Sequence, residues 1–196
     1  MPDEPLTLDP TTTALVLIDL QKGIVSRDTA PHASADVVAN GARLADAFRA
    51  AGALVVLVHV AFSADKRDML NPPRDEVPPP STASPDWSDI VPEVGPRPGD
   101  VVVTKRQWGA FYGTDLELQL RRRGIRTLVL GGIATNYGVE STARDAWERG
   151  YALVLAEDAT ATFTAEAHSL ALKYVFPRIA RVRSTADVLA ALGAAS

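Results

Sequence analysis

The stretch TLVLGGIATNYGVESTARDA, residues 127–146, decides the fold because it joins a strand, a tight turn and a helix. It begins as a short apolar run, continues with two glycines and ends with the spacing of an amphipathic helix. In such a unit the backbone N–H groups of the turn point into the crevice beyond the strand, where a helix start favours an anion or a developing oxyanion. Close packing of the helix on the strand explains the glycines equally well. The unit therefore predicts a parallel α/β sheet and leaves the role of its turn open.

The same alternation of apolar strands and helical patterns continues in both directions along the chain. Glycines at 52, 124 and 150 lie where helix C-caps belong, and TDLE at 114–117 is typical of a capping box. The pattern predicts an α/β fold, a Rossmann-like three-layer α/β/α sandwich with a six-stranded parallel sheet. The predicted strands are Ala14–Ile18, Ala53–Val60, Val101–Thr104, Thr127–Leu130, Ala152–Ala156 and Ala180–Val182. The predicted helices are Ala35–Ala51, Asp115–Arg123, Asn136–Arg149, Ala165–Tyr174 and Thr185–Leu192.

Length, charge and composition predict one domain over residues 1–196. The 196 residues, 46% of them hydrophobic, can bury one core and are too few for two ordinary domains. A net charge of −4 offers no basic surface for nucleic acid or for a membrane, so a small molecule is the expected partner. The first ten residues predict a tail without the features of a secretory signal, and no apolar run has membrane-spanning length. We therefore expect a cytoplasmic protein.

The segment 61–99 interrupts the alternation of strands and helices. It holds nine of the 14 prolines and lacks aliphatic periodicity, which predicts a long loop. Because this loop follows the second predicted strand, it is expected to form a lid or a wall of a ligand site. A rigid surface excursion that packs at a subunit interface is the alternative.

Two charged residues end apolar strands. Asp19 follows the first predicted strand and Lys105 follows the third. Ligands of open parallel sheets bind beyond the carboxyl ends of the strands, and an unpaired carboxylate is costly to bury there. The two residues are therefore candidates for an ion pair in a binding crevice. Taken singly, each is also explained as a strand-end charge that reaches solvent.

Cysteine is absent from the chain, and this absence excludes disulfides, thiolate metal sites and a thiol nucleophile. The three histidines, His32, His59 and His168, lie far apart in the sequence. They predict neither a metal site nor a cofactor. His168 lies on a predicted helix and is expected to pack or cap.

Three segments together resemble the signatures of the isochorismatase-like, or cysteine hydrolase, superfamily. They are LIDLQ at 17–21, KRQWGAF at 105–111 and GIATNYGVESTARDA at 132–146, in the order and spacing of the superfamily. The similarity runs from about Thr12 to Leu192. The resemblance implies a catalytic Asp19, a catalytic Lys105 and a reactive position at Gly138. It also implies a cis peptide between Ile133 and Ala134, which holds amides toward the substrate.

The glycine at position 138 departs from the amidase members of the superfamily, which carry their nucleophilic cysteine there. True isochorismatases resemble this chain in having glycine, and they cleave a vinyl ether without a covalent intermediate. The resemblance implies a hydrolase in which Asp19 is the general acid, provided that burial raises its pKa more than Lys105 lowers it. The stretch HVAFSADKR at 59–67 lacks the glutamine that isochorismatases carry there, which argues against isochorismate itself.

The residues near Asp19, Lys105 and Gly138 are expected to contact the substrate. The expected substrate-binding residues are Gln21, Trp108, Phe111, Ile133, Ala134 and Tyr137. Ordinary core packing is the alternative for Trp108 and Phe111. Ser141 and Thr142 lie about one turn into the helix, so their hydroxyls are expected to cap or pack instead of acting as nucleophiles.

Two alternative functions and the oligomeric state remain to be considered. A binding or regulatory protein that kept the pocket is the alternative to an enzyme. A nicotinamidase-type amidase is disfavoured by the missing thiol and metal ligands. The resemblance also implies a homodimer or a higher homo-oligomer.

Overall fold

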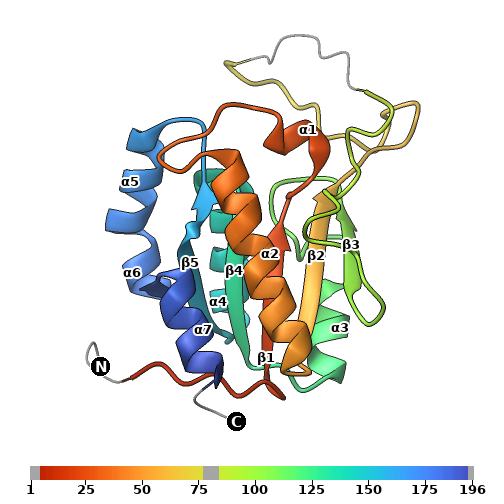
Figure 1. The fold of residues 1–196 in the computed structure, drawn as a ribbon. Helices are drawn as coiled ribbons and strands as arrows, with labels where there is room; N and C mark the ends of the chain where they lie inside the picture. Colours follow the sequence, from red (N-terminus) through yellow and green to blue (C-terminus); the bar gives the residue numbers. More distant parts are fainter. Residues whose placement is uncertain (1–4, 77–83, 194–196) are drawn as a thin grey trace.

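The computed structural model describes residues 5–76 and 84–193. Its six strands form one parallel sheet in the order β3-β2-β1-β4-β5-β6 (Figure 1). The strands are β1 Thr13–Ile18, β2 Leu54–Val60, β3 Val101–Lys105, β4 Thr127–Ile133, β5 Ala152–Ala161 and β6 Arg181–Arg183. This order confirms the predicted Rossmann-like sheet.

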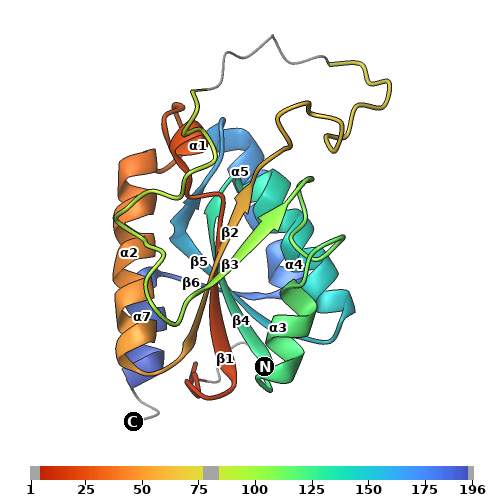
Figure 2. The same cartoon turned by 90° about the vertical axis from the view of Figure 1, so that its right-hand side faces the viewer.

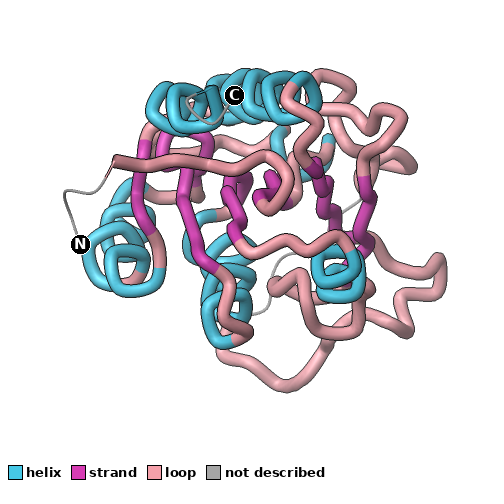
Figure 3. The backbone as a smooth tube through the Cα atoms, turned by 90° about the horizontal axis from the view of Figure 1, so that it is seen from below, coloured by secondary structure: helices cyan, strands magenta, loops and turns pink. Residues whose placement is uncertain are grey.

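Helices cover both faces of the sheet (Figures 2 and 3). One face packs against α2 (Ser34–Ala50) and α7 (Thr185–Gly193). The opposite face packs against α3 (Leu116–Arg122), α4 (Glu140–Glu148), α5 (Ala165–Tyr174) and α6 (Phe176–Ile179). The side chains of β1 alternate between these two cores and all six of its residues are buried, as expected for a central strand.

The observed element ends differ from the predicted ones mainly where the backbone is irregular. The predicted helix 136–149 begins as a π-helix, η1 (Thr135–Val139), before it continues as α4. Strand β5 extends to Ala161, five residues beyond the prediction, because it contains a bulge. The predicted capping box is wrong, because the Thr114 hydroxyl accepts from the N–H of Leu116, at 3.2 Å, and Leu116 is the first residue of α3.

Two four-residue helices, α1 (Lys22–Val25) and α6, were not predicted from the sequence.

Part of each predicted irregular segment packs against the rest of the fold, whereas residues 61–76 of the long loop are mostly exposed. Leu8, in the predicted tail, is buried, and its N–H donates to the Ala191 carbonyl at 3.2 Å. Residues 84–94 of the long loop return to the carboxyl end of β1, where Ile90 pairs with Gln21 and Val94 is buried. Among the described residues, no helix is long and apolar enough to cross a membrane.

Candidate active site

The strand order brings Asp19 and Lys105 to one edge of the sheet. Asp19 follows β1 directly, at a positive φ of 54°, and its N–H donates to the Val58 carbonyl of β2. Lys105 is the last residue of β3, next to Val60 at the end of β2. Both side chains are buried, with side-chain exposures of 9% for Asp19 and 2% for Lys105. Each charge therefore needs the other for its stabilisation, because water does not solvate a buried charge fully.

The two charges form a direct ion pair. Lys105 Nζ donates to Asp19 Oδ2 at 2.7 Å, and also to the carbonyls of Gln107 at 3.1 Å and Trp108 at 2.9 Å. These three acceptors occupy all three protons of an ammonium. The alternative in which each charge reaches solvent separately is therefore wrong. Lys105 acts on its surroundings through its charge, since it has no N–H left to donate.

The second carboxylate oxygen of Asp19 does not take part in this ion pair. Oδ1 is buried and has no hydrogen-bond partner within the described parts of the chain. Burial raises the pKa of Asp19 to about 6, and the charge and hydrogen bond of Lys105 oppose this rise without cancelling it. Both protonation forms are therefore accessible near neutral pH, as a group that gives or takes a proton requires.

Gly138 faces this pair from the π-helix η1. A Cβ atom on Gly138 would lie 3.0 Å from Ile18 Cγ2, 3.1 Å from Asp19 Oδ2 and 3.4 Å from Lys105 Nζ. Any side chain at this position would project onto the ion pair and crowd it. Glycine therefore keeps open the space directly beside the acid.

The turn that carries Gly138 is held tightly against β1. Gly132 has a φ of +124°, and a Cβ there would lie only 2.0 Å from the Ile18 carbonyl oxygen, so this close approach requires glycine. The Ile133–Ala134 peptide is cis, as the resemblance implied. The buried Thr142 hydroxyl donates to the Gly138 carbonyl at 2.7 Å and accepts from the Ala110 N–H, so it packs within the fold, one of the two expected roles.

An aromatic wall extends from the Lys105 side of the site. Trp108 and Tyr137 are 61% and 37% exposed, and their rings lie 4.9 Å apart. Tyr137 also contacts Phe163, and the Arg27 guanidinium lies 3.6 Å above the Phe163 ring. Phe163 and Arg27 were not predicted from the sequence. Phe163 lies just beyond the observed end of β5, but seven residues beyond the predicted end of that strand, so the sequence offered no signal for it.

The other expected substrate residues lie deeper in the protein. The Gln21 carboxamide is buried and bonds to the N–H and carbonyl of Val60 and to the Trp87 carbonyl, so its polar atoms hold the loop to the sheet. Phe111 lies in the core against Tyr151, which agrees with the packing alternative. Ile133 and Ala134 are also buried, at the end of β4.

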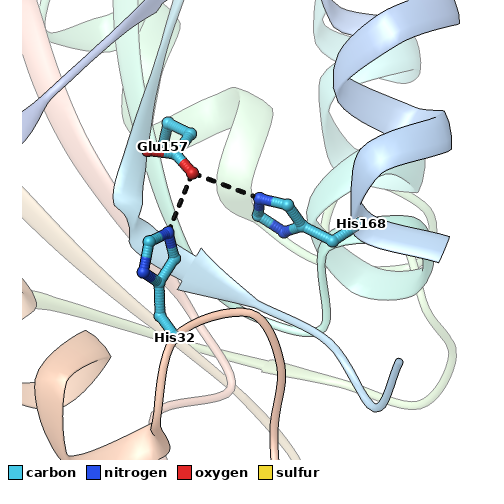
Figure 4. A group of neighbouring side chains, drawn as sticks. All are labelled: His32, Glu157 and His168. Atoms are coloured by element: carbon cyan, nitrogen blue, oxygen red, sulfur yellow. Dashed lines mark hydrogen bonds and ion pairs between the residues drawn. The ribbon is translucent and has the colours of Figure 1, made fainter. Parts of the chain in front are cut away.

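The prediction that the three histidines are isolated is wrong for two of them. His32 and His168 converge on the carboxylate of Glu157, with ring centroids 5.8 Å apart (Figure 4). Only His59 stands apart, bonded to the Ser88 carbonyl and the Thr104 hydroxyl. Sequence spacing cannot reveal such a cluster because its members come from a loop, a strand and a helix.

A buried acid–ammonium pair at the carboxyl ends of the strands of a Rossmann-ordered sheet is the arrangement in which α/β enzymes bind small molecules. The family model for the isochorismatase domain matches residues 13–187. The chain belongs to the isochorismatase family and is a hydrolase of that family, as its three segments predicted.

The most similar proteins support this membership along the whole chain. YecD of Escherichia coli O157:H7, an uncharacterized isochorismatase family protein, is 51% identical over 187 residues, 95% of this chain and 100% of YecD. The structure of an isochorismatase family protein from Burkholderia thailandensis matches with a TM-score of 0.92 and 50% identity, over 97% of this chain and 100% of that chain. The ureidoacrylate amidohydrolase RutB of Variovorax paradoxus is 36% identical over 180 residues, 80% of this chain and 71% of RutB.

Proposed function

We propose that this hydrolase cleaves a small vinyl ether without a covalent intermediate, with Asp19 as the acid and base and Lys105 as its electrostatic partner. The observation that carries the proposal is the open position at Gly138. The place where a side chain would touch both Asp19 Oδ2 and Lys105 Nζ holds only hydrogen, which leaves room for a substrate carbon or a water molecule. With no cysteine anywhere in the chain, water is the nucleophile that remains.

The proposed reaction begins with protonated Asp19. The carboxyl gives its proton to the terminal carbon of the enol ether, and the C=C electron pair forms the new C–H bond, which leaves an oxocarbenium ion. Water adds to the carbon that bears the ether oxygen, which is the electrophilic centre of this ion, and returns one proton to the Asp19 carboxylate. The hemiketal then transfers its hydroxyl proton to the ether oxygen and collapses to a ketone and an alcohol. The sum is one vinyl ether and one water consumed, one ketone and one alcohol formed.

The surroundings of Asp19 suit both protonation states that the proposed reaction requires of it. Burial favours the neutral acid before reaction, and the fixed Lys105 ammonium stabilises the carboxylate that forms after the proton leaves. Tyr137 and Trp108 offer apolar faces to an unsaturated substrate, and Arg27 provides a cation beside Phe163 at the end of the same wall. We therefore propose an unsaturated substrate that carries an anionic group.

Amide hydrolysis is the second candidate, favoured by the likeness to RutB, a ureidoacrylate amidohydrolase. Asp19 would then act as a base on water, and the tetrahedral intermediate would form without an enzyme thiol. The two reactions require opposite protonation states of Asp19 at the first step. They are therefore distinguishable by pH as well as by substrate.

The test is a panel of enol ethers and ureido or simple amides incubated with the protein in deuterated water. Vinyl-ether hydrolysis places one solvent deuterium on the methyl carbon of the ketone product, which mass spectrometry detects. Deuterium-free ketone would contradict protonation at carbon. Binding without turnover of any panel member would favour a binding or regulatory protein that has kept the pocket.

We also propose that the chain forms a homodimer or a higher homo-oligomer. Large side chains on the outer helices support this proposal, because Trp147, Leu170 and Tyr174 are each about half exposed. Light scattering on the purified protein measures the assembly directly. A monomer at micromolar concentration would contradict it.

A further inference from the structure

The cluster formed by His32, Glu157 and His168 lies outside the proposed active site. Glu157 Oε1 lies 2.8 Å from His32 Nε2 and 3.4 Å from His168 Nε2 (Figure 4). One ligand atom from each of the three residues lies within 4.8 Å of the other two. Two imidazole nitrogens and one carboxylate oxygen thus point toward a common centre.

The bulge in β5 is what directs Glu157 toward the histidines. Leu130 of β4 pairs with Leu155, whereas Gly132 pairs with Thr160, so the residues between Leu155 and Thr160 leave the regular ladder. The Thr160 hydroxyl donates to the Glu157 carbonyl at 2.8 Å and fixes the bulge from within. Bulges that re-aim a side chain are frequent next to functional sites.

Asp158, the neighbour of Glu157, fastens the same bulge to two helices. Its carbonyl accepts from Asn40 Nδ2 of α2 at 2.8 Å. Its carboxylate accepts from both the N–H and the hydroxyl of Thr185, at 2.6 and 2.7 Å, at the start of α7. The backbone around Glu157 is therefore held in place both by the sheet and by helices α2 and α7.

Each histidine is also fixed by a contact away from the centre. His168 is 2% exposed, and its Nδ1 is hydrogen-bonded to the Thr135 hydroxyl at 2.9 Å. If Nδ1–H donates to that hydroxyl, Nε2 keeps a free lone pair toward Glu157. The segment that carries His32 is bridged to Thr162 by two backbone hydrogen bonds, made by Ala30 at 2.7 and 2.9 Å. The Thr29 hydroxyl donates to the His32 carbonyl at 2.8 Å.

We propose that His32, Glu157 and His168 bind a divalent first-row transition metal ion, with Zn²⁺ as the best-fitting probe, and leave a fourth position for water. Ligands at about 2.0–2.2 Å from a tetrahedral zinc ion lie roughly 3.3–3.6 Å from one another. The distance of 3.4 Å from Glu157 Oε1 to His168 Nε2 lies in this range, and the 2.8 Å to His32 Nε2 must lengthen by roughly 0.5 Å when the ion enters. The ion replaces the two contacts that this oxygen makes with the imidazoles.

The donor set selects the class of ion. Imidazole nitrogen is a preferred ligand of zinc, copper, nickel and iron, whereas Mg²⁺ and Ca²⁺ require oxygen ligands. An ion bound here ties the 26–33 segment, β5 and α5 together. It also orders Thr135, the first residue of the π-helix that carries Gly138. The inference does not depend on the reaction proposed for Asp19.

The experiment uses the full, untagged chain after removal of metal by a chelator. Zn²⁺ titration is followed by calorimetry, and Co²⁺ titration by the visible absorption of the bound ion. We expect one ion per chain. His32→Gln and Glu157→Gln should each weaken binding at least tenfold, and Thr135→Val should weaken it by roughly 10–100-fold, as loss of an outer hydrogen bond to a metal-bound histidine does.

His59→Gln is the matched control, because it removes a histidine that lies outside the cluster. It should keep the affinity of the unmodified chain. Circular dichroism verifies the fold of each variant. The buried His168 is not substituted, since its loss would confound binding with folding. Absence of one-to-one binding in the unmodified chain, or unchanged affinity in His32→Gln and Glu157→Gln, would overturn the metal site.

Discussion

Asp19 and Glu157 are two carboxylates on the same sheet, in opposite surroundings. Asp19 is buried, shares one oxygen with an ammonium and leaves the other without a partner among the described residues. Glu157 is about one third exposed and directs one oxygen at two imidazoles. The surroundings decide the chemistry of each group. Burial beside a fixed cation suits Asp19 to proton transfer, whereas the two neighbouring imidazole nitrogens suit Glu157 to binding a metal ion.

The largest expected effect is the loss of turnover when Asp19, and not an exposed aspartate, is substituted. Asp19→Asn keeps the size of the side chain and removes the proton that it transfers. Turnover of an identified substrate should fall by roughly 10²–10⁴-fold, the usual contribution of a general acid or base. Asp36→Asn, on the exposed first turn of α2, makes the same chemical change far from the pair and should leave turnover unaltered. Equal turnover in both variants would remove Asp19 from the mechanism.

The pH dependence of activity tests the raised pKa of Asp19 directly. Vinyl-ether cleavage requires the protonated form, so kcat/KM should be level below about pH 6 and fall as pH rises through that value. Each further pH unit lowers the protonated fraction about tenfold, which amounts to roughly a hundredfold loss by pH 8. The amide reaction needs the carboxylate and should show the opposite slope. A profile without an inflection near pH 6 would contradict both uses of Asp19.

The sequence predicted Asp19 and Lys105 because their signal is local. Each ends an apolar strand, and parallel strands bring their carboxyl ends to one edge whatever the loops between them do. The five helical patterns with clear periodicity were also found. Position 138 became informative only through the resemblance, because a single glycine in a turn has many explanations.

The histidine cluster could not be predicted, for an equally physical reason. Its geometry depends on the bulge between Leu155 and Thr160, and nothing in the apolar pattern of ALVLAEDATA, residues 152–161, shows where the strand leaves its ladder. Gln21 and Phe111 were misplaced on a smaller scale. Gln21 lies close to Asp19 in the sequence and Phe111 lies close to Trp108, but the backbone turns both side chains inward, where Gln21 binds the loop and Phe111 fills the core.

Gly138→Cys sharpens the comparison by placing a third reactive group beside Asp19. The new Cβ would crowd Ile18 Cγ2 and Asp19 Oδ2, so the native reaction should slow roughly five- to 150-fold, as a cost of about one to three kcal/mol from overpacking implies. The thiol would lie near Lys105 Nζ, and the cation should lower its pKa. Iodoacetamide labelling as a function of pH measures that pKa. An unperturbed thiol pKa would mean that position 138 does not sense the pair.

The smallest expected effect concerns the aromatic wall, which links the two regions. It runs from Trp108, whose carbonyl accepts from Lys105, to Phe163, whose neighbour Thr162 is bridged to the segment of His32. If the wall only binds substrate, Trp108→Ala should raise KM roughly three- to tenfold, the equivalent of about one kcal/mol of lost stacking, and leave kcat nearly constant. Leu118→Ala removes an exposed apolar side chain from α3 and controls for general loss of apolar surface. A fall in kcat with constant KM would instead show that the Trp108 indole acts in the chemical step, because the alanine variant keeps the backbone carbonyl that binds Lys105.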